Sequence, residues 1–233
     1  MLRHTPIRKP GQNVATLATY TIPEAAAFLA MQSRTLFEWY SGEFPILKPS
    51  AHYGAMSLLS FRDLEEAYKV HLLRTKHRFP LQYLRKAMKD AREKSGSDHP
   101  LLDVEIDVMD RLALIIPGRG RRRRRAVTLG DPSVPDYFPE VVRAWGRRIS
   151  KGSKGEVQLF PWRFAKSDDE SRPVSLNPEV MSGRLVVTGT RIPVNLLWGR
   201  RLSGEPIESI ADDYSLEIER VRQALIHIDQ KVA

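Results

Sequence analysis

Residues 20–40 read YTIPEAAAFLAMQSRTLFEWY, and this stretch predicts two short helices in close succession. Thr21 can cap the first helix, Pro23 suits its first turn, and Glu24 stands at the capping-box spacing from Thr21. Ser33 can cap the second helix. Two short helices joined by about three residues have the spacing of a helix-turn-helix.

Two longer amphipathic helices are predicted beyond a segment rich in turn-forming residues. Residues 45–60 contain two prolines and Gly54, which favours a β-hairpin or a loop over a helix. The helices are expected from residue 61 to Pro80 and from there to Gly96. Apolar residues recur along one face of each, at Phe61, Leu64, Tyr68 and Leu72 in the first and at Leu81, Leu84, Met88 and Ala91 in the second.

The middle of the chain is predicted to hold another hairpin and a run of positive charge. Residues 104–108 alternate in polarity and residues 112–116 are all apolar, which suits two paired strands. Six arginines follow within residues 117–125. A helix is expected over 134–149 and a strand over 156–160.

The C-terminal residues predict a further hairpin and then three short helices. A polar linker at 161–173 precedes the expected hairpin at 174–187. The helices are expected to begin near Pro193, Pro206 and Ser215, and the last has Ile218, Val221, Leu225 and Ile228 on one face.

Positive charge is concentrated in the first two-thirds of the chain. The 233 residues include 37 Lys and Arg against 28 Asp and Glu, for a net charge of +9. Residues 1–164 carry +11 and residues 165–233 carry −2. This asymmetry is typical of a nucleic-acid-binding part joined to another domain, although surface charge that serves only solubility is the alternative.

The first helix pair and the start of the third helix contain a characteristic set of motifs: Tyr20-Thr21-Ile22-Pro23-Glu24-Ala25-Ala26, Ser33-Arg34-Thr35-Leu36, Trp39 and Leu59-Ser60-Phe61-Arg62-Asp63-Leu64. With these residues the segment resembles the winged helix of MerR-type regulators. MerR relatives often carry glycine where Ala30 lies and basic residues where Phe37 and Glu38 lie. The metal-sensing members use thiolates, and this chain has no cysteine, so metal sensing is excluded.

The C-terminal part contains the specific string Gly189-Thr190-Arg191-Ile192-Pro193-Val194, accompanied by Asn177-Pro178, Gly183, Gly204 and Ile210-Ala211-Asp212-Asp213-Tyr214. With these motifs it resembles a small family of Vap-type antitoxins from bacterial toxin–antitoxin operons. The resemblance implies a partner toxin of the PIN ribonuclease fold.

The two resemblances complete the predicted organisation. We expect an α+β fold with an N-terminal winged helix-turn-helix, a middle segment with a hairpin, and a C-terminal hairpin followed by a three-helix, helix-turn-helix-like bundle. The expected parts are a flexible arm at 1–18, the winged helix at 19–100, the arginine-rich segment at 101–165 and the antitoxin-type domain at 166–233.

The second short helix and the hairpin after it are the candidate DNA-binding surface. The first turn of a recognition helix reaches base edges, and the hairpin contacts the sugar–phosphate backbone and the minor groove. The candidates are Ser33, Arg34, Thr35 and Glu38 on the helix and Lys48, His52 and Tyr53 on the hairpin. Leu36 and Trp39 are expected in the core. Protein contact by a degenerate winged helix is the alternative.

The unbroken arginine run has three interpretations. Arg121, Arg122, Arg123, Arg124 and Arg125 can neutralise DNA phosphates and so increase the salt dependence of binding. They can instead dock onto the carboxylates that hold Mg²⁺ in a PIN-type nuclease. A solvated loop without a partner is the third interpretation.

Four residues of the antitoxin-like part are candidates for a structural or partner-binding role. Thr190 and Arg191 precede a predicted helix, and Arg191 is expected to tie the hairpin to the bundle through carbonyl groups or a carboxylate such as Asp212. A contact with the toxin or with a second copy is the alternative. Arg220 and Arg222 alternate with glutamates on the last helix, which favours protein contact over phosphate binding.

An enzyme and a membrane protein are both disfavoured. The histidines show no helical pair with zinc-ligand spacing, and the G-x-S-x-G, P-loop and G-x-G-x-x-G motifs are absent. No apolar run approaches the length of a membrane helix. The first residues lack the apolar core of a signal peptide and are expected to form a polar arm.

The leading hypothesis is therefore a cytoplasmic bacterial antitoxin that is also an autorepressor. The N-terminal part is expected to bind double-stranded operator DNA, and the C-terminal part is expected to bind a PIN-type toxin, in a homodimer or a larger assembly. No cofactor or metal is expected. A stand-alone MerR-like regulator and an interaction module that does not bind DNA are the alternatives.

Overall fold

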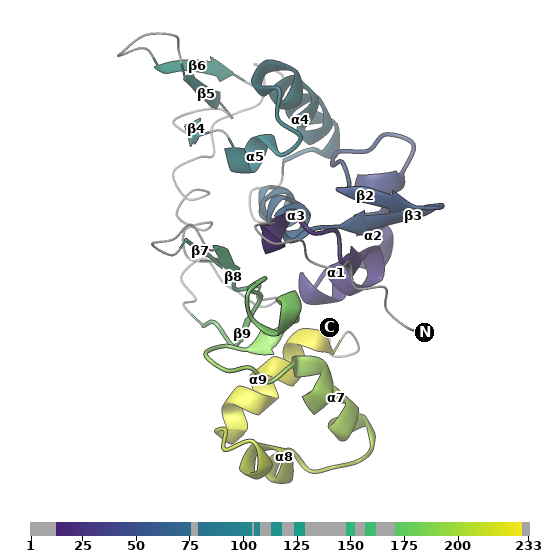
Figure 1. Ribbon diagram of the computed structural model, residues 1–233, viewed down its shortest axis with the longest axis vertical. Helices are drawn as coiled ribbons and strands as arrows, with labels where there is room; N and C mark the ends of the chain where they lie inside the picture. The colour runs from purple at the N-terminus through teal and green to yellow at the C-terminus, as the bar shows by residue number, and fades with distance from the viewer. Residues whose placement is uncertain are drawn as a thin grey trace. The chain divides into compact units, whose positions relative to one another are not determined.

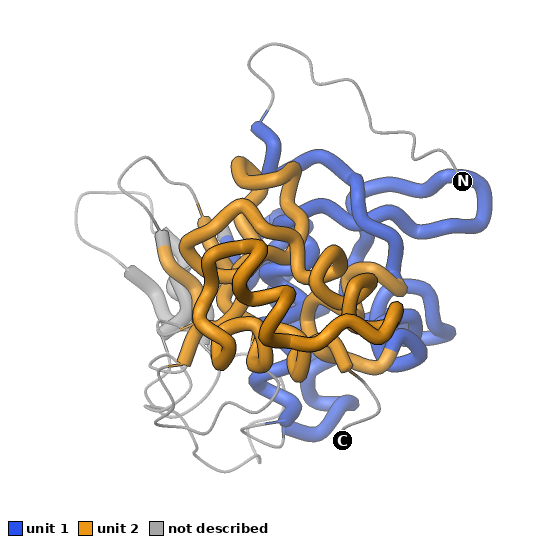
Figure 2. Tube along the Cα trace, turned by 90° about the horizontal axis from the view of Figure 1, so that it is seen from below, with its two compact units in different colours: residues 1–22, 33–146 blue, residues 23–32, 147–233 orange. Residues whose placement is uncertain are grey.

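The chain is an α+β protein of helices and small antiparallel sheets (Figure 1). The computed structural model describes residues 13–75, 79–103, 105–107, 113–117, 124–128, 148–151, 157–161 and 171–229. Two compact units are distinguished (Figure 2): residues 1–22 with 33–146, and residues 23–32 with 147–233. Among the helices in the described ranges, none is long and apolar enough to cross a membrane.

The first unit is built from helices and two three-stranded sheets. Its elements are η1 (Val14–Thr16), β1 (Tyr20–Thr21), α2 (Ser33–Ser41), β2 (Ala51–Tyr53), β3 (Met56–Leu59), α3 (Phe61–Thr75), α4 (Leu81–Ser95), α5 (Pro100–Asp103), β4 (Glu105–Asp107), β5 (Ala113–Pro117) and β6 (Arg124–Thr128).

The predicted hairpin between residues 45 and 60 is formed by β2 and β3. Tyr53 pairs with Met56 across a turn in which Gly54 has a φ of 58°, a left-handed conformation that glycine adopts without a steric penalty. Strand β1 adds to the other edge of β3, giving the order β1-β3-β2. Thr21, expected as a helix cap, is thus also a strand residue that pairs with Leu58.

Helices α3 and α4 form the core of the first unit in the predicted way. The expected face of α3, from Phe61 to Leu72, is buried. Helix α4 ends where expected, because Gly96 has a φ of 69° and donates its N–H to the Arg92 carbonyl. The burial of Asp63 and of the charged residues Glu65, Glu66 and Lys69 on α3 was not predicted.

The middle hairpin is present and has an additional strand. Strand β5 pairs with β4 as predicted, and it also pairs with β6. Arg124 and Arg125 lie in β6, which the sequence did not predict, whereas Arg121, Arg122 and Arg123 lie outside the described residues.

Most of the helix expected over 134–149 lies outside the described residues, but its last position is corrected by the structure. Ile149 lies in a strand, β7, and pairs with Leu159. Strand pairing of this β-branched residue therefore prevails over the helical periodicity that suggested a helix there.

The second unit combines small hairpins with a set of three C-terminal helices. Its elements are α1 (Ile22–Phe28, of which Ile22 belongs to the first unit), β7 (Ile149–Lys151), β8 (Val157–Leu159), β9 (Val174–Ser175), η2 (Met181–Gly183), β10 (Val186–Val187), α7 (Val194–Leu202), α8 (Ile207–Asp213) and α9 (Ile218–Ile228).

The strands of this unit place the start of α7 against the hairpin. The predicted hairpin over 174–187 is formed by β9 and β10, which pair antiparallel. Val186 of β10 also bridges to Pro193, the residue before α7, and Leu159 of β8 bridges to Leu176. Helices α7, α8 and α9 pack on one another, and their inner residues Leu197, Ile210, Val221 and Leu225 are buried.

Residues 23–32, which include most of α1, group with the C-terminal residues. His227 is fully buried on α9, and its Nε2 lies 3.0 Å from the carbonyl oxygen of Phe28 at the end of α1. Helix α1 closes with a Schellman motif, since Met31 donates to Ala26 and Ala30 donates to Ala27. Ala30 adopts a φ of 55° to make this turn.

Candidate functional site

The exposed face of α2 carries one arginine, and that arginine is paired with a carboxylate. Arg34 is 82% exposed, but its guanidinium lies 2.7 Å from the Glu38 carboxylate. Ser33 is exposed and Thr35 is half-buried beside it, while Leu36 and Trp39 are buried as predicted. The spacing of four residues between Arg34 and Glu38 could have indicated this ion pair, because such residues are neighbours on a helix.

Two contacts fix the end of α2 relative to the hairpin that follows it. The hydroxyls of Ser41 and Ser57 are 2.8 Å apart and join α2 to β3. The Trp39 carbonyl accepts the N–H groups of both Ile46 and Leu47 at 2.9 Å. The helix and the hairpin are therefore held as one surface within the first unit.

The hairpin itself carries exposed polar and aromatic residues. His52 and Tyr53 are exposed on β2, as a contact surface requires. Lys48 is also exposed, but its Nζ lies 2.8 Å from a carboxylate oxygen of Asp98. Both members of the pair are more than half exposed, so the interaction is weak enough to exchange for a phosphate.

The turn at Gly189–Val194 is stabilised by Thr190. Its Oγ1 donates to the Val187 carbonyl at 2.8 Å and accepts the Ile192 N–H at 3.0 Å. This is a structural role, and it positions Arg191 on the exposed side of the turn that leads into α7.

The residue that ties the hairpin to the bundle is Arg220, not Arg191. The Arg220 guanidinium donates to the Thr188 carbonyl, joining α9 to the residue that follows β10. Arg191 is exposed and makes no hydrogen bond or ion pair with the described residues, Asp212 included. Arg222 pairs within its own helix with Glu219, at 2.7 Å.

Sequence reasoning missed a cation that organises α7 and α8. Arg200 donates to both carboxylate oxygens of Glu205 and to Asp213, and its guanidinium lies 5.3 Å from the centre of the Tyr214 ring. The hydrogen bonds to Glu205 and Asp213 raise the pKa of Arg200 above its usual value. No local spacing indicated this group, because its members come from two helices and the turns after them.

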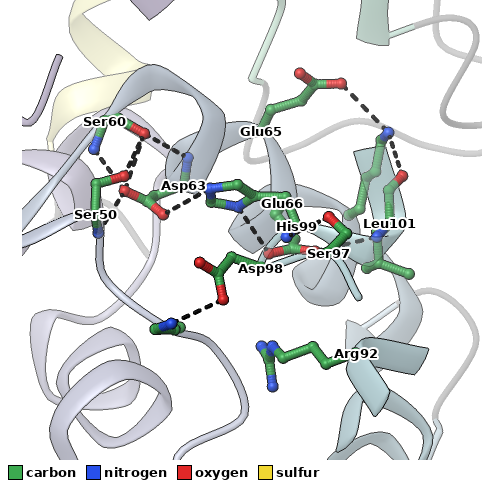
Figure 3. A network of polar contacts seen from close by, with 12 residues as sticks. Ser50, Ser60, Asp63, Glu65, Glu66, Arg92, Ser97, Asp98, His99 and Leu101 are labelled. Atoms are coloured by element: carbon green, nitrogen blue, oxygen red, sulfur yellow. Dashed lines mark hydrogen bonds and ion pairs between the residues drawn. The ribbon is translucent and has the colours of Figure 1, made fainter. Parts of the chain in front are cut away.

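A second missed group is the buried polar network around α3 (Figure 3). Ser60 and Asp63 form a reciprocal capping box at the start of α3, with the Ser60 N–H 2.6 Å from Asp63 Oδ2 and the Asp63 N–H 3.2 Å from Ser60 Oγ. The Ser50 N–H also donates to Asp63 Oδ2, at 3.1 Å.

The same network includes a histidine from the segment after α4. His99 Nδ1 lies 3.2 Å from Glu66 Oε2, and His99 Nε2 lies 3.8 Å from Asp63 Oδ1. The network does not form a metal site, since the described part of the chain holds no group of three carboxylate or imidazole ligands arranged around a metal position. Nothing in the sequence marked His99 as a partner of α3.

Comparisons with known proteins bear on the second unit and on the fold. A family model described as "Protein of unknown function (DUF433)" matches residues 174–227, the segment from β9 through most of α9. None of the curated proteins matches the chain. The chain is similar to a solved structure, the X-ray crystal structure of Rv2018 from Mycobacterium tuberculosis, with 21% sequence identity and a TM-score of 0.57. That similarity covers 90% of this chain and 98% of the other, and it supports a shared fold.

Proposed function

We propose that this protein is a cytoplasmic antitoxin that binds operator DNA through its first unit and a PIN-type ribonuclease toxin through its second. The observation that carries the proposal is the exposed Arg191, held on a rigid turn without a partner among the described residues. A free guanidinium on a fixed turn suits the carboxylate cluster of a Mg²⁺-dependent nuclease, because arginine forms bidentate hydrogen bonds with carboxylates.

The DNA-binding half of the proposal is supported by the joined surface of α2 and the β2–β3 hairpin. A helix followed by a hairpin, with Thr35 on the first turn and His52 and Tyr53 on the hairpin, is the arrangement of a winged helix-turn-helix. The net charge of +11 on residues 1–164 favours a polyanionic partner.

Toxin binding is tested by co-expression with the protein encoded by the adjacent gene. The wild-type chain is expected to restore growth and to co-purify with that protein, whereas Arg191→Ala should weaken the complex at least tenfold, as for removal of a charged hydrogen-bonding partner at an interface. Arg184→Ala is the matched control, since Arg184 is an exposed arginine of the same unit that lies outside the Gly189–Val194 turn. Absence of both a complex and growth rescue with the wild-type chain contradicts the antitoxin proposal.

DNA binding is tested by mobility shift on the promoter upstream of the gene, repeated at increasing salt concentration. A specific shift is expected, and Thr35→Ala should weaken it without changing its salt dependence, because a base contact releases no counterion. Gln82→Ala, which changes an exposed neutral residue of α4 in the same unit, is the control.

A second candidate function is protein binding by the first unit. The Arg34–Glu38 pair neutralises the helix that would read DNA, and Phe37 on the same helix is 45% exposed. An exposed aromatic beside a neutral ion pair favours a protein partner over a phosphate backbone. The absence of any mobility shift at low salt would support this candidate.

A further inference from the structure

We propose that His99 is a proton-operated latch: its imidazolium holds residues 97–103 against helix α3, and loss of the proton releases that segment. The inference does not depend on the proposed function. It rests on the placement of His99 between two buried carboxylates of the first unit (Figure 3).

One oxygen of each carboxylate faces His99, whereas the other oxygen, Asp63 Oδ2 or Glu66 Oε1, accepts backbone N–H groups. Asp63 and Glu66 stand one turn apart on α3, and each residue is 1% exposed. Asp63 Oδ1 has no hydrogen-bond partner among the described residues, and His99 Nε2 lies 3.8 Å from it. A buried carboxylate oxygen without a partner is costly, so a proton on Nε2 is strongly favoured by this position.

A neutral imidazole cannot satisfy both carboxylates. When the neutral imidazole carries its proton on Nδ1, that N–H donates to Glu66 Oε2. The unprotonated Nε2 then turns its lone pair toward Asp63 Oδ1. The charged form donates toward both. Consistent with this geometry, burial lowers the pKa of His99, but the hydrogen bond to Glu66 and the negative charges of Glu66 and Asp63 outweigh it and the pKa is raised above 6.5.

Other charged groups of the first unit affect the protonation of His99 or the charge of its carboxylate partners. The positive charge of Arg62 on α3 opposes protonation of His99. Arg92 on α4 offsets part of the negative charge of Glu66 and Asp98. Lys69 is already paired with Glu65, at 3.3 Å, and Lys48 with Asp98. The Tyr40 hydroxyl on α2 stays neutral, because burial raises its pKa.

The latched segment is short and makes its contacts through a few groups. The Leu101 N–H donates to Glu66 Oε1 at 3.1 Å, and the Leu101 carbonyl accepts from Lys69 Nζ at 3.0 Å. Asp98 in the same segment holds Lys48 of the loop before β2. Opening therefore frees Lys48.

The direction of the pH dependence follows from the raised pKa. The stabilisation by His99 is fully present below the pKa of the released histidine and is lost as the pH rises through the pKa of the latched histidine. For each unit by which the pKa of the latched histidine exceeds that of the released histidine, the opening equilibrium changes by about tenfold over the titration.

Hydrogen–deuterium exchange of the full chain tests the latch. The readout is the exchange of a peptide covering residues 97–103 between pH 6 and pH 8.5, corrected for the intrinsic pH dependence of amide exchange. A severalfold loss of protection is expected in the wild type as the pH rises. His99→Gln is expected to abolish this pH dependence, and His52→Gln, which changes an exposed histidine of the same unit, is expected to keep it.

A second variant separates a latch from a merely structural histidine. Glu66→Gln removes the charge that faces Nδ1 and is expected to move the midpoint of the protection loss to lower pH, a shift that also decides the question if His99→Gln fails to fold. Protection that does not change with pH in the wild type, a pH dependence that survives in His99→Gln, or an unmoved midpoint in Glu66→Gln overturns the proposal.

Discussion

Ala30 is one of four residues other than glycine that have a positive φ in the described part of the chain. Its φ of 55° closes helix α1 in a Schellman motif, and an L-residue in the left-handed region is disfavoured by roughly 1–2 kcal/mol. Glycine carries no such penalty.

Ala30→Gly is therefore expected to stabilise the protein. The relief of the left-handed strain exceeds the added entropy of the unfolded chain, for a net gain of about 0.5–1 kcal/mol in the free energy of unfolding. Urea titration measures it. Ala27→Gly, inside the same helix, is the control and should destabilise by about 0.5–1 kcal/mol. Equal destabilisation by both variants would show that position 30 is not strained.

At the level of the elements, α2 and α3 are joined by one buried hydrogen bond. The Tyr40 hydroxyl donates to the Asp63 carbonyl at 2.7 Å, and burial keeps that hydroxyl protonated by raising its pKa. The orientation of α2, which presents the candidate DNA-binding face, thus depends on a contact with the first turn of α3.

Tyr40→Phe is expected to lower the free energy of unfolding by about 1–2 kcal/mol, because a buried carbonyl loses its donor. The measurement is chemical denaturation monitored by circular dichroism. Tyr53→Phe provides the comparison, since Tyr53 is 67% exposed and its hydroxyl can be replaced by water contacts at little cost. A loss for Tyr53→Phe as large as that for Tyr40→Phe would argue against the proposed role of the buried bond.

Element types were predictable where the determinants are local. The apolar face of α3 and the glycine end of α4 both follow from spacings within about four residues. Strand β6 was missed because the run from Arg121 to Arg125 lacks the alternation that marks a strand, and its pairing partner β5 decides its conformation.

At the scale of the whole molecule, the positive charge of residues 1–164 predicts binding to a nucleic acid. Replacing Arg121–Arg125 with glutamine is expected to reduce the slope of log K against log salt by about 0.9 for each arginine that contacts a phosphate. Affinity should fall for all sequences alike, since phosphate contacts do not read bases. The measurement is fluorescence anisotropy with specific and unrelated duplexes at several salt concentrations.

The control for this prediction removes positive charge from the second unit. Arg184→Gln and Arg201→Gln change exposed arginines of the slightly acidic C-terminal part, and the slope is expected to stay the same. If the slope does not change after replacement of the arginine run, these arginines do not contact phosphates, and they face a partner protein or solvent instead.

The sequence by itself determined the features that depend on near neighbours: the helix ends, the buried faces, the turn at Gly54 and the capping box of Ser60 and Asp63. Tertiary structure alone decided which polar and charged groups far apart in the sequence pair with one another. Arg220 and not Arg191 ties the β10 turn to α9, and His99 meets two carboxylates on a helix more than thirty residues earlier in the chain. The physical reason is that burial and electrostatic pairing depend on distances in space, which residues far apart in sequence acquire only when the chain folds.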